Sequence, residues 1–323
     1  MTMSHDDATW FAQAFGQIAD NISLAVLGKD HVVRLAVATL LAEGHMLLED
    51  APGTGKTSLA RALSATVAGT HKRIQFTPDL LPTDVTGVTV YDQRSGEFDF
   101  RPGPIFASIV LADEINRASP KTQSALLEVM EEGQVTVDGV TRPTGRPFMV
   151  IATQNPIEQA GTYRLPEAQM DRFLMKTSIG YPDRTSMVEI LGGATIKDRA
   201  ATIGPVINTE NVAAMADLAT TVYTDQSLLD YVARLGEASR MTHETRVGIS
   251  TRGVLAMIRV AKVWAASQGR EYVTPDDIKD LAEPVWQHRL VLDPDAEFAG
   301  ASAEKIISRI LTEVSVPTIR AAA

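Results

Sequence analysis

The fold is decided by one short stretch of the chain, Leu47-Leu48-Glu49-Asp50-Ala51-Pro52-Gly53-Thr54-Gly55-Lys56-Thr57-Ser58-Leu59-Ala60. Its apolar start is typical of a buried strand, its middle is a glycine-rich turn, and its end is typical of a helix. Backbone N–H groups at a helix N-terminus converge on an anion, so this context indicates a loop that binds phosphate. The alternative is a plain glycine turn that opens a helix and leaves its lysine in solvent.

Two side chains of this loop have the chemistry that a bound nucleotide needs. We expect the ammonium of Lys56 to reach the β- and γ-phosphates, and the hydroxyl of Thr57 to ligate Mg²⁺. The strict phosphate-loop pattern begins with glycine, whereas this chain has Asp50 at that position. The departure leaves the positions that touch phosphate unchanged, because Gly53, Gly55, Lys56 and Thr57 are all present.

A second apolar run, residues 108–112, ends in two adjacent carboxylates, Asp113 and Glu114. Buried strands rarely end in adjacent acids unless a positive or protic group meets them. We therefore expect Asp113 to hold Mg²⁺ through water and Glu114 to polarise the water that attacks the γ-phosphorus. The alternative is structural, with Asp113 capping the N-terminus of the helix that follows.

A third apolar run, residues 148–153, leads to Asn155. Loops beyond the carboxyl ends of parallel strands are where such sheets bind ligands. Asn155 can therefore face the γ-phosphate and orient water. An Asx-turn before Pro156 is the alternative.

Two arginines have no obvious partner near them in the sequence. Arg172 follows a segment that opens like a helix, and it could stabilise the γ-phosphate of a neighbouring subunit or pair with a nearby carboxylate. Arg252 lies in the first turn of an expected helix, where a cation opposes the helix macrodipole. We therefore expect Arg252 to meet an anion, either a nucleotide or a carboxylate.

The order of apolar runs and helical stretches predicts an α/β fold. Strands separated by helices are typical of a mostly parallel sheet covered on both faces. The strands are expected at residues 46–48, 74–76, 108–112 and 148–153. After residue 183 the strand signals fade, and helices are expected over residues 227–241, 250–268 and 275–289. We therefore expect a nucleotide-binding core over residues 1–183 and an all-helical domain over residues 184–323.

Two β-hairpins are expected as insertions in this α/β frame. The first turns at residues 92–96, with Val88 and Val90 on one face and Phe98 and Phe100 on the other. The second turns at Asp138-Gly139, the strongest short-range hairpin signal. The apolar residues of the first hairpin could face a partner or pack on their own core.

The chain has 323 residues, no cysteine and a formal net charge of -10. Without cysteines, disulfides, thiolate metal sites and cysteine nucleophiles are excluded, which favours a reducing compartment. The N-terminus lacks the order of a secretory signal, and no apolar run approaches the length of a membrane helix. We therefore expect a soluble cytoplasmic protein without a membrane partner, and the negative charge disfavours nucleic acid.

With these parts in this order, the chain resembles the MoxR family of AAA+ ATPases. The resemblance covers the chain from about Val26 to Leu290 and rests on residues 48–57, 111–118, 153–156, 165–173 and 272–277. The family implies an αβα P-loop core with two β-hairpin insertions, an all-helical lid, and a ring, usually a hexamer, that binds ATP between neighbouring subunits.

The resemblance also implies roles for single residues. Asn155 corresponds to sensor 1, Arg172 to the arginine finger and Arg252 to sensor 2. Arg164 stands where the family often has proline, and either Arg164 or Arg172 could face the neighbouring subunit. In the family, the residues after the first helix line the adenine pocket. The full set that we expect to bind ATP is Val26, Leu27, Gly28, Pro52, Gly53, Thr54, Gly55, Lys56, Thr57 and Ser58, with Thr57 and Asp113 holding Mg²⁺.

MoxR proteins are generally viewed as chaperone-like ATPases that remodel or activate partners, often partners with von Willebrand factor A domains. The main hypothesis is therefore a ring ATPase acting on proteins. A nucleic-acid motor, an ATPase subunit of a metal-chelatase-like complex, and a module that binds ATP without hydrolysis are the alternatives. The motor is disfavoured because a charge of -10, repeated around a ring, repels phosphates.

Overall fold

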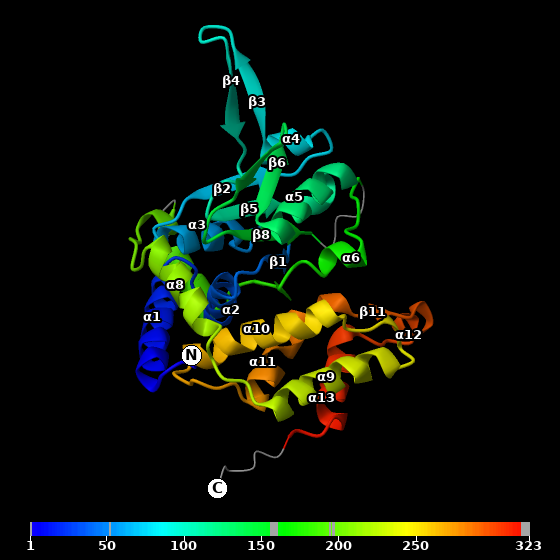
Figure 1. Ribbon diagram of the computed structural model, residues 1–323. Coiled ribbons are helices and arrows are strands. Elements are labelled where there is room, and N and C mark those ends of the chain that lie inside the picture. The colour runs from blue at the N-terminus through cyan, green and yellow to red at the C-terminus, as the bar shows by residue number, and fades with distance from the viewer. Residues whose placement is uncertain (1, 52, 156–160, 194, 196–197, 318–323) are drawn as a thin grey trace. The chain divides into compact units, whose positions relative to one another are not determined.

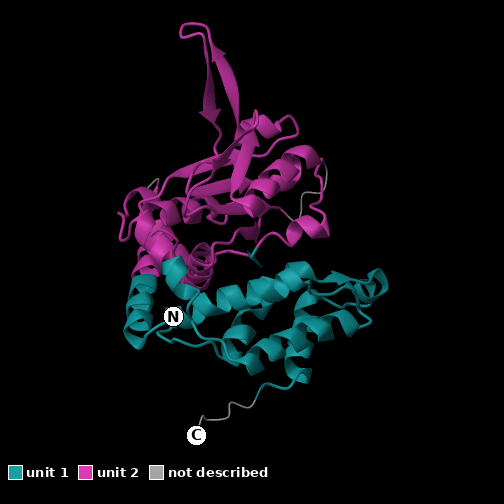
Figure 2. Cartoon of the chain, viewed as in Figure 1, with its two compact units in different colours: residues 1–16, 174–176, 215–323 teal, residues 17–173, 177–214 magenta. Residues whose placement is uncertain are grey.

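The computed structural model describes residues 2–51, 53–155, 161–193, 195 and 198–317. Contacts divide the chain into two compact units (Figure 2). Unit 1 comprises residues 1–16, 174–176 and 215–323, and unit 2 comprises residues 17–173 and 177–214. No helix in the described ranges is both long enough and apolar enough to cross a membrane.

Unit 2 contains four strands of a sheet, in the order β2-β5-β8-β1. They are β1 (Met46–Glu49), β2 (His71–Gln75), β5 (Ile109–Asp113) and β8 (Met149–Gln154). The fifth strand of the sheet is the short β9 (Met175–Thr177), of which residues 175 and 176 are counted in unit 1. The pairs β2–β5, β5–β8 and β8–β1 are parallel, which confirms the expected α/β fold. Because these strands are parallel, their carboxyl ends lie on the same side of the sheet. The polar residues that follow β1, β5 and β8 are therefore close to one another there.

Helices cover this sheet on both faces, so its central strands are buried and apolar (Figure 1). The helices up to residue 219 are α1 (His5–Ser23), α2 (Asp30–Leu41), α3 (Lys56–Thr66), α4 (Pro82–Thr86), α5 (Pro120–Glu132), α6 (Glu167–Met170), α7 (Arg184–Gly192) and α8 (Thr209–Ala219). On one face, Leu126 and Leu127 of α5 share a buried cluster with Val110 of β5. Burying such side chains contributes about 1.5–3 kcal/mol each, so the sheet is a rigid platform for the residues at its edge.

Both expected hairpins are confirmed. The first is β3 (Gly87–Asp92) with β4 (Glu97–Pro102), and it extends away from the rest of its unit (Figure 1). The second is β6 (Gln134–Val137) with β7 (Val140–Pro143), joined by Asp138-Gly139. Both turn residues have positive φ, 52° and 75°, as the two-residue turn requires.

The first hairpin is covered at its base and exposed at its tip. Register places Tyr91 beside Phe98 and Thr89 beside Phe100, so both phenylalanines share one face as expected. Phe100 packs against Phe106 and under the Arg142 guanidinium, which lies 3.9 Å from the ring centroid. Phe98 is 75% exposed, with its ring centroid 5.2 Å from that of Tyr91. Packing on the protein's own core therefore accounts for Phe100 but not for Phe98.

Residues 184–214 cluster with the sheet, although the sequence places a boundary at residue 183. Arg61 of α3 pairs with Asp198 at 2.8 Å, and the backbone N–H of Val206 donates to the carbonyl of Thr66 at 2.9 Å. These contacts hold the segment against α3. A fading strand signal marks the end of the sheet, whereas this ion pair and this backbone hydrogen bond extend the compact unit further.

Unit 1 contains the helices that the sequence predicts near the C-terminus. They are α9 (Gln226–Met241), α10 (Thr251–Ser267), α11 (Pro275–Trp286), α12 (Pro294–Phe298) and α13 (Ala303–Glu313). The short 3₁₀ turn η3 (Gln287–Arg289) completes the helical segments of this unit, whereas the turn η2 (Arg199–Ala201) belongs to unit 2. One short antiparallel strand pair, β10 (Thr245–Val247) with β11 (Val291–Leu292), accompanies the helices, and Tyr223 and Tyr272 form an isolated parallel bridge.

Unit 1 contains a buried ion pair whose loss should destabilise it. Arg270 donates to both oxygens of Asp277 at 2.8 and 2.5 Å, and the carboxylate, only 2% exposed, also caps α11 through Thr274. Asp277→Asn leaves the guanidinium without its anion, so we expect unit 1 to lose about 2–3 kcal/mol of unfolding free energy.

Tryptophan fluorescence during urea unfolding measures this loss, because Trp10, Trp264 and Trp286, the three tryptophans of the chain, all lie in unit 1. Asp276→Asn is the matched control. That carboxylate is exposed and pairs only with Lys279 among the described residues, so its loss should change stability by less than about 0.5 kcal/mol. Equal effects of the two substitutions would contradict the role of Asp277.

Candidate active site

The glycine-rich stretch forms a turn between β1 and α3, so the predicted strand-to-helix context is confirmed. Gly53 and Gly55 have φ of 83° and 98°, in the left-handed region that side chains other than glycine rarely adopt. No atom lies within 4 Å of a Cβ built at either position, so backbone conformation rather than crowding requires glycine. The turn thus leaves open space in front of the first N–H groups of α3. Pro52 lies outside the described residues.

Asp50, the residue that departs from the strict pattern, is buried, and both of its carboxylate oxygens accept hydrogen bonds within unit 2. Its carboxylate accepts hydrogen bonds from the Ser178 hydroxyl at 2.7 Å and from the N–H groups of Ile179 and Gly180 at 2.6 and 2.9 Å. A glycine at this position could make none of these contacts. The acid therefore ties the start of the loop to the segment after β9, while the loop's backbone still faces the cavity.

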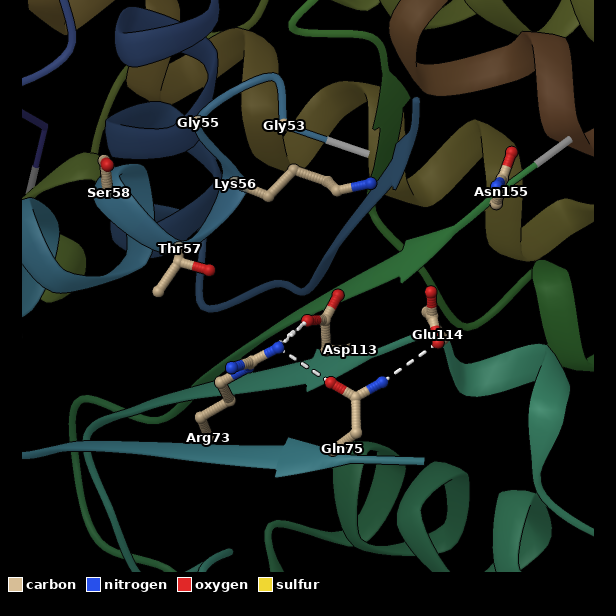
Figure 3. A pocket seen from close by; sticks show the side chains of 10 residues that line it. All are labelled: Gly53, Gly55, Lys56, Thr57, Ser58, Arg73, Gln75, Asp113, Glu114 and Asn155. Atoms are coloured by element: carbon tan, nitrogen blue, oxygen red, sulfur yellow. Dashed lines mark hydrogen bonds and ion pairs between the residues drawn. The ribbon is translucent and has the colours of Figure 1, made fainter. Parts of the chain in front are cut away.

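A cavity of about 330 Å³ opens beside this loop. Figure 3 shows side chains from three strand ends and from the loop directed into it. The residues that line it are Gly53, Gly55, Lys56, Thr57, Ser58, Arg73, Gln75, Asp113, Glu114 and Asn155. The ammonium of Lys56 donates to the carbonyls of Asp50 and Ala51, at 3.0 and 3.3 Å. The solvated-lysine alternative therefore does not describe this side chain.

Asp113 ends β5 with both carboxylate oxygens hydrogen-bonded. One oxygen accepts from the Thr153 hydroxyl at 2.7 Å, and the other pairs with Arg73 at 2.6 Å. The short 3₁₀ helix η1 (Ile115–Arg117) that follows has no side-chain cap among the described residues. The capping alternative therefore does not describe Asp113, which lines the cavity instead.

Glu114 has a backbone conformation that is unusual for its residue type. Its φ and ψ are 57° and 50°, the left-handed region, which costs roughly 1–2 kcal/mol for a residue with a Cβ. Its N–H donates to Thr153 at 2.9 Å, and its carboxylate accepts from Gln75 at 3.0 Å and pairs with Arg117 at 3.0 Å. An extended backbone would turn this side chain to the opposite face from Asp113, whereas both line one cavity.

Asn155 follows β8 and is buried at the same cavity. It is one residue beyond the strand that also provides Thr153, so β5 and β8 supply the site jointly. The alternative of an Asx-turn depends on Pro156, which lies outside the described residues.

Sequence reasoning missed Arg73 and Gln75, which line the cavity from β2 (Figure 3). The parallel register places Gln75 beside Asp113. Arg73 and Gln75 are two residues apart on β2, so their side chains lie on the same face of the strand. Arg73 and Gln75 were therefore detectable as polar residues on one strand face. Their position at the site depended on the pairing of β2 with β5.

A second cavity of about 660 Å³ lies on the other side of the loop within unit 2. Val26, Leu27 and Thr54, three of the residues that we expect to bind ATP, line this cavity. Tyr181, Met187 and Ile190 add apolar surface that the sequence did not reveal. Lys29, Arg61, Asp198 and Arg199 line the same cavity, so its lining is partly apolar and partly charged. A cavity of this kind that shares Gly53, Gly55, Thr57 and Ser58 with the first one suits a base whose phosphates extend into that first cavity.

Gly28 serves this second cavity by allowing close packing. Its φ is 68°, and a Cβ there would lie 2.0 Å from the Ser186 hydroxyl oxygen of α7. The helix begins beside it, because Asp183 accepts from the Ser186 N–H at 2.8 Å. This hydrogen bond is the largest cause that lowers the pKa of Asp183 and keeps the cap charged.

Comparison with known proteins identifies the family. The pattern of the ATPase family associated with various cellular activities matches residues 45–175, and that of the AAA lid domain matches residues 237–310. YeaC of Bacillus subtilis is 47% identical over 307 residues, 95% of this chain and 96% of that protein. Chaperone MoxR1 of Mycobacterium tuberculosis is 41% identical, over 92% of this chain and 80% of that protein. The chain belongs to the MoxR family of AAA+ ATPases.

A solved structure agrees with this assignment. A candidate ATPase from Cytophaga hutchinsonii has a TM-score of 0.91 and 36% sequence identity, covering 97% of this chain and 98% of that one. The MoxR protein is thus a nucleotide-binding ATPase with an AAA core and a lid domain.

The arginines that the MoxR resemblance singles out lie in different surroundings. Arg172 is partly exposed and pairs with Glu131 at 3.0 Å, as its structural alternative expects, while its Nε is buried without a hydrogen-bond partner among the described residues. Arg164 is exposed. Arg252 is exposed in the first turn of α10, in unit 1, where Ser250 caps the helix through the N–H of Gly253. The functions of these arginines stay predictions.

Proposed function

We propose that this MoxR protein forms a ring, usually a hexamer, and uses Mg²⁺-dependent ATP hydrolysis to remodel or activate protein partners. One observation carries the proposal, namely that Lys56, Thr57, Asp113, Glu114 and Asn155 line a single cavity at the sheet edge. These residue types supply phosphate binding, a metal ligand, a base for water and a γ-phosphate contact. The chaperone name of the Mycobacterium tuberculosis relative supports protein partners.

The donor set at the cavity suits Mg²⁺. Thr57 and Asp113 offer a hydroxyl and a carboxylate, the hard oxygen ligands that Mg²⁺ prefers, and the ion usually completes its shell with phosphates and water. Within the described residues, no three His, Cys, Asp or Glu side chains group as a metal site. A bound Mg²⁺ would neutralise negative charge on the phosphates of the nucleotide.

The residues of the chain perform the remaining steps. The loop N–H groups and Lys56 hold the phosphates, and Glu114 accepts a proton from the attacking water as the water approaches the γ-phosphorus in line. Asn155 orients that water. The new P–O bond forms as the bond to the β,γ-bridging oxygen breaks, leaving ADP and phosphate.

The γ-phosphate requires a further positive group, and a neighbouring subunit would supply it. Within the cavity, Arg73 is already paired with Asp113. We therefore assign the arginine finger to Arg172 of the neighbour, with Arg164 as the alternative, and sensor 2 to Arg252. Functionally, residues 1–183 act as the ATPase core and residues 184–323 as the lid.

The first hairpin is the proposed contact with the protein partner, which the resemblance expects to carry a von Willebrand factor A domain. Its tip presents Tyr91 and Phe98 to solvent, and exposed apolar patches mark partner surfaces. The surrounding charge does not favour nucleic acid, since Arg94 is accompanied by Asp92 and Glu97. A nucleic-acid motor and a metal-chelatase subunit stay as alternatives, and a cytoplasmic location fits the absence of cysteine.

Phe98→Ala tests this function. We expect Mg²⁺-dependent turnover and assembly to stay within about twofold of wild type, while stimulation of turnover by a protein partner falls at least tenfold, the loss typical of an exposed aromatic hot spot. The partner is a protein that copurifies with the ATP-bound Glu114→Gln protein. ATP turnover is then measured with and without this partner, in Mg²⁺ and in EDTA. Phe298→Ala is the matched control, because that ring is 96% exposed and lies in unit 1.

Two outcomes would contradict the proposal. Turnover that is equal in Mg²⁺ and EDTA would remove the metal from the mechanism. A large loss of melting temperature in Phe98→Ala, with the partner response unchanged per folded molecule, would make the hairpin structural rather than a contact with partners.

A further inference from the structure

Arg73 is paired with the carboxylate of Asp113, which is a ligand of Mg²⁺ in the proposed function. Its Nη2 and Nε atoms donate to one oxygen of Asp113 at 2.6 and 3.2 Å (Figure 3). The other oxygen of Asp113 is taken by the hydroxyl of Thr153. The guanidinium is therefore the cation at this carboxylate, and it stands inside the cavity that also contains Thr57.

The contact is specific, because a neighbour orients the guanidinium. Register on β2 and β5 places Arg73 beside Leu111, so its side chain must extend along the strand to reach Asp113. Gln75 accepts from the Nη2 atom of Arg73 at 2.7 Å and donates to Glu114 at 3.0 Å. One hydrogen-bonded chain thus connects Arg73 with both acids of the site.

The ion pair between Arg73 and Asp113 can be broken without destabilising the fold. The side chain of Arg73 is 49% exposed while that of Asp113 is 14% exposed, so the arginine can move into solvent without uncovering the core. Half-exposed ion pairs contribute little to folding. A bare divalent cation bound at Asp113 and Thr57 would gain one carboxylate and one hydroxyl from those two residues, whereas a cation carried by a nucleotide brings phosphate ligands as well.

We propose that Arg73 is a resident counter-ion that keeps divalent cations off Asp113 until they arrive together with a nucleotide. The inference rests on the proposed Mg²⁺ function of Asp113. Arg73 outcompetes a bare cation because its guanidinium is tethered beside the carboxylate. It leaves when the nucleotide supplies the phosphate ligands that a divalent cation needs, because the cation would then neutralise Asp113 in its place. Metal and nucleotide therefore enter the site as one unit.

Binding of Mn²⁺ to the nucleotide-free full chain, measured by electron paramagnetic resonance, tests this role without turnover. Arg73→Met keeps an unbranched apolar side chain on the strand and removes the charged guanidinium. We expect its Mn²⁺ dissociation constant to fall about fivefold, which is about 1 kcal/mol at 25 °C, and Asp113→Asn in that background to abolish the gain. Arg73→Lys should stay within about twofold of wild type, because it keeps a tethered cation.

Arg94→Met is the matched control, since it removes the same charge from the exposed turn of the first hairpin. Its Mn²⁺ affinity should equal that of wild type. An unchanged or weakened Mn²⁺ affinity in Arg73→Met would overturn the proposal. So would a loss of ATP relative to ADP affinity with Mn²⁺ binding unchanged, because that result makes Arg73 a γ-phosphate ligand.

The failure of the underlying function gives a different result. If wild-type protein binds ATP equally well with Mg²⁺ and with EDTA, the metal function of Asp113 is wrong whatever Arg73 does. If Mg²⁺ strengthens ATP binding in wild type but Arg73→Met leaves Mn²⁺ affinity unchanged, only the counter-ion role fails.

Discussion

Replacing Glu114 with glutamine should reduce ATP turnover by roughly a hundredfold or more while ATP still binds, because the amide cannot accept the proton of the attacking water. Its carbonyl oxygen can still accept the hydrogen bond from Gln75, so the cavity should keep its shape. Lys56→Ala should instead weaken ATP binding by about ten- to a hundredfold, since it removes a charged hydrogen-bond donor from the phosphates. Phosphate release measures turnover, and titration calorimetry measures binding.

Glu97→Gln is the control for the charge change, because Glu97 is exposed on the first hairpin and its loss should leave both quantities unchanged. Equal ATP affinity in wild type and Lys56→Ala would refute the phosphate loop. Turnover of Glu114→Gln within threefold of wild type would show that another group activates the water.

The second large effect should come from Arg172→Ala, which we expect to reduce turnover by about 10³-fold or more without unfolding the subunit. Its pair with Glu131 is partly exposed, so its loss should cost no more than about 1 kcal/mol of stability. If the arginine acts on the neighbour's nucleotide, mixing Arg172→Ala with Lys56→Ala subunits should restore activity. In a mixed ring some sites combine an intact phosphate loop with an intact arginine.

Arg164→Ala is the comparison that assigns the finger, because Arg164 is the other arginine that could face a neighbour. The residue whose variant loses turnover and recovers it on mixing is the finger. No recovery in either mixture, together with turnover per subunit that stays constant on dilution, would mean that each site is complete within one subunit.

The phosphate loop and the sheet were predictable because their signals are local. Glycines at fixed spacing before Lys56 specify the turn, and apolar runs specify the strand that ends in Asp113 and the strand that Asn155 follows. The short strand β9 (Met175–Thr177) was missed, because three residues carry little periodicity.

What could not be predicted depends on contacts between distant segments. Arg73 reaches the site only because β2 pairs with β5, and no local pattern encodes the strand order. The use of Asp50 depends on N–H groups of Ile179 and Gly180, far along the chain. Residues 184–214 join unit 2 through contacts with α3 for the same reason. The sequence identifies the reacting groups, whereas folding selects the groups that hold them in place.

The left-handed backbone conformation of Glu114 lowers the stability of the fold, while the side chain of the same residue serves the proposed reaction. Glycine would adopt that conformation without strain, so selection for heat resistance alone would favour losing this side chain. Selection for turnover would oppose that change. Descendants of such a protein that no longer hydrolyse ATP should therefore acquire glycine or asparagine at position 114 readily. Either residue relieves the backbone strain and thus stabilises the fold, while the carboxylate needed for turnover is lost.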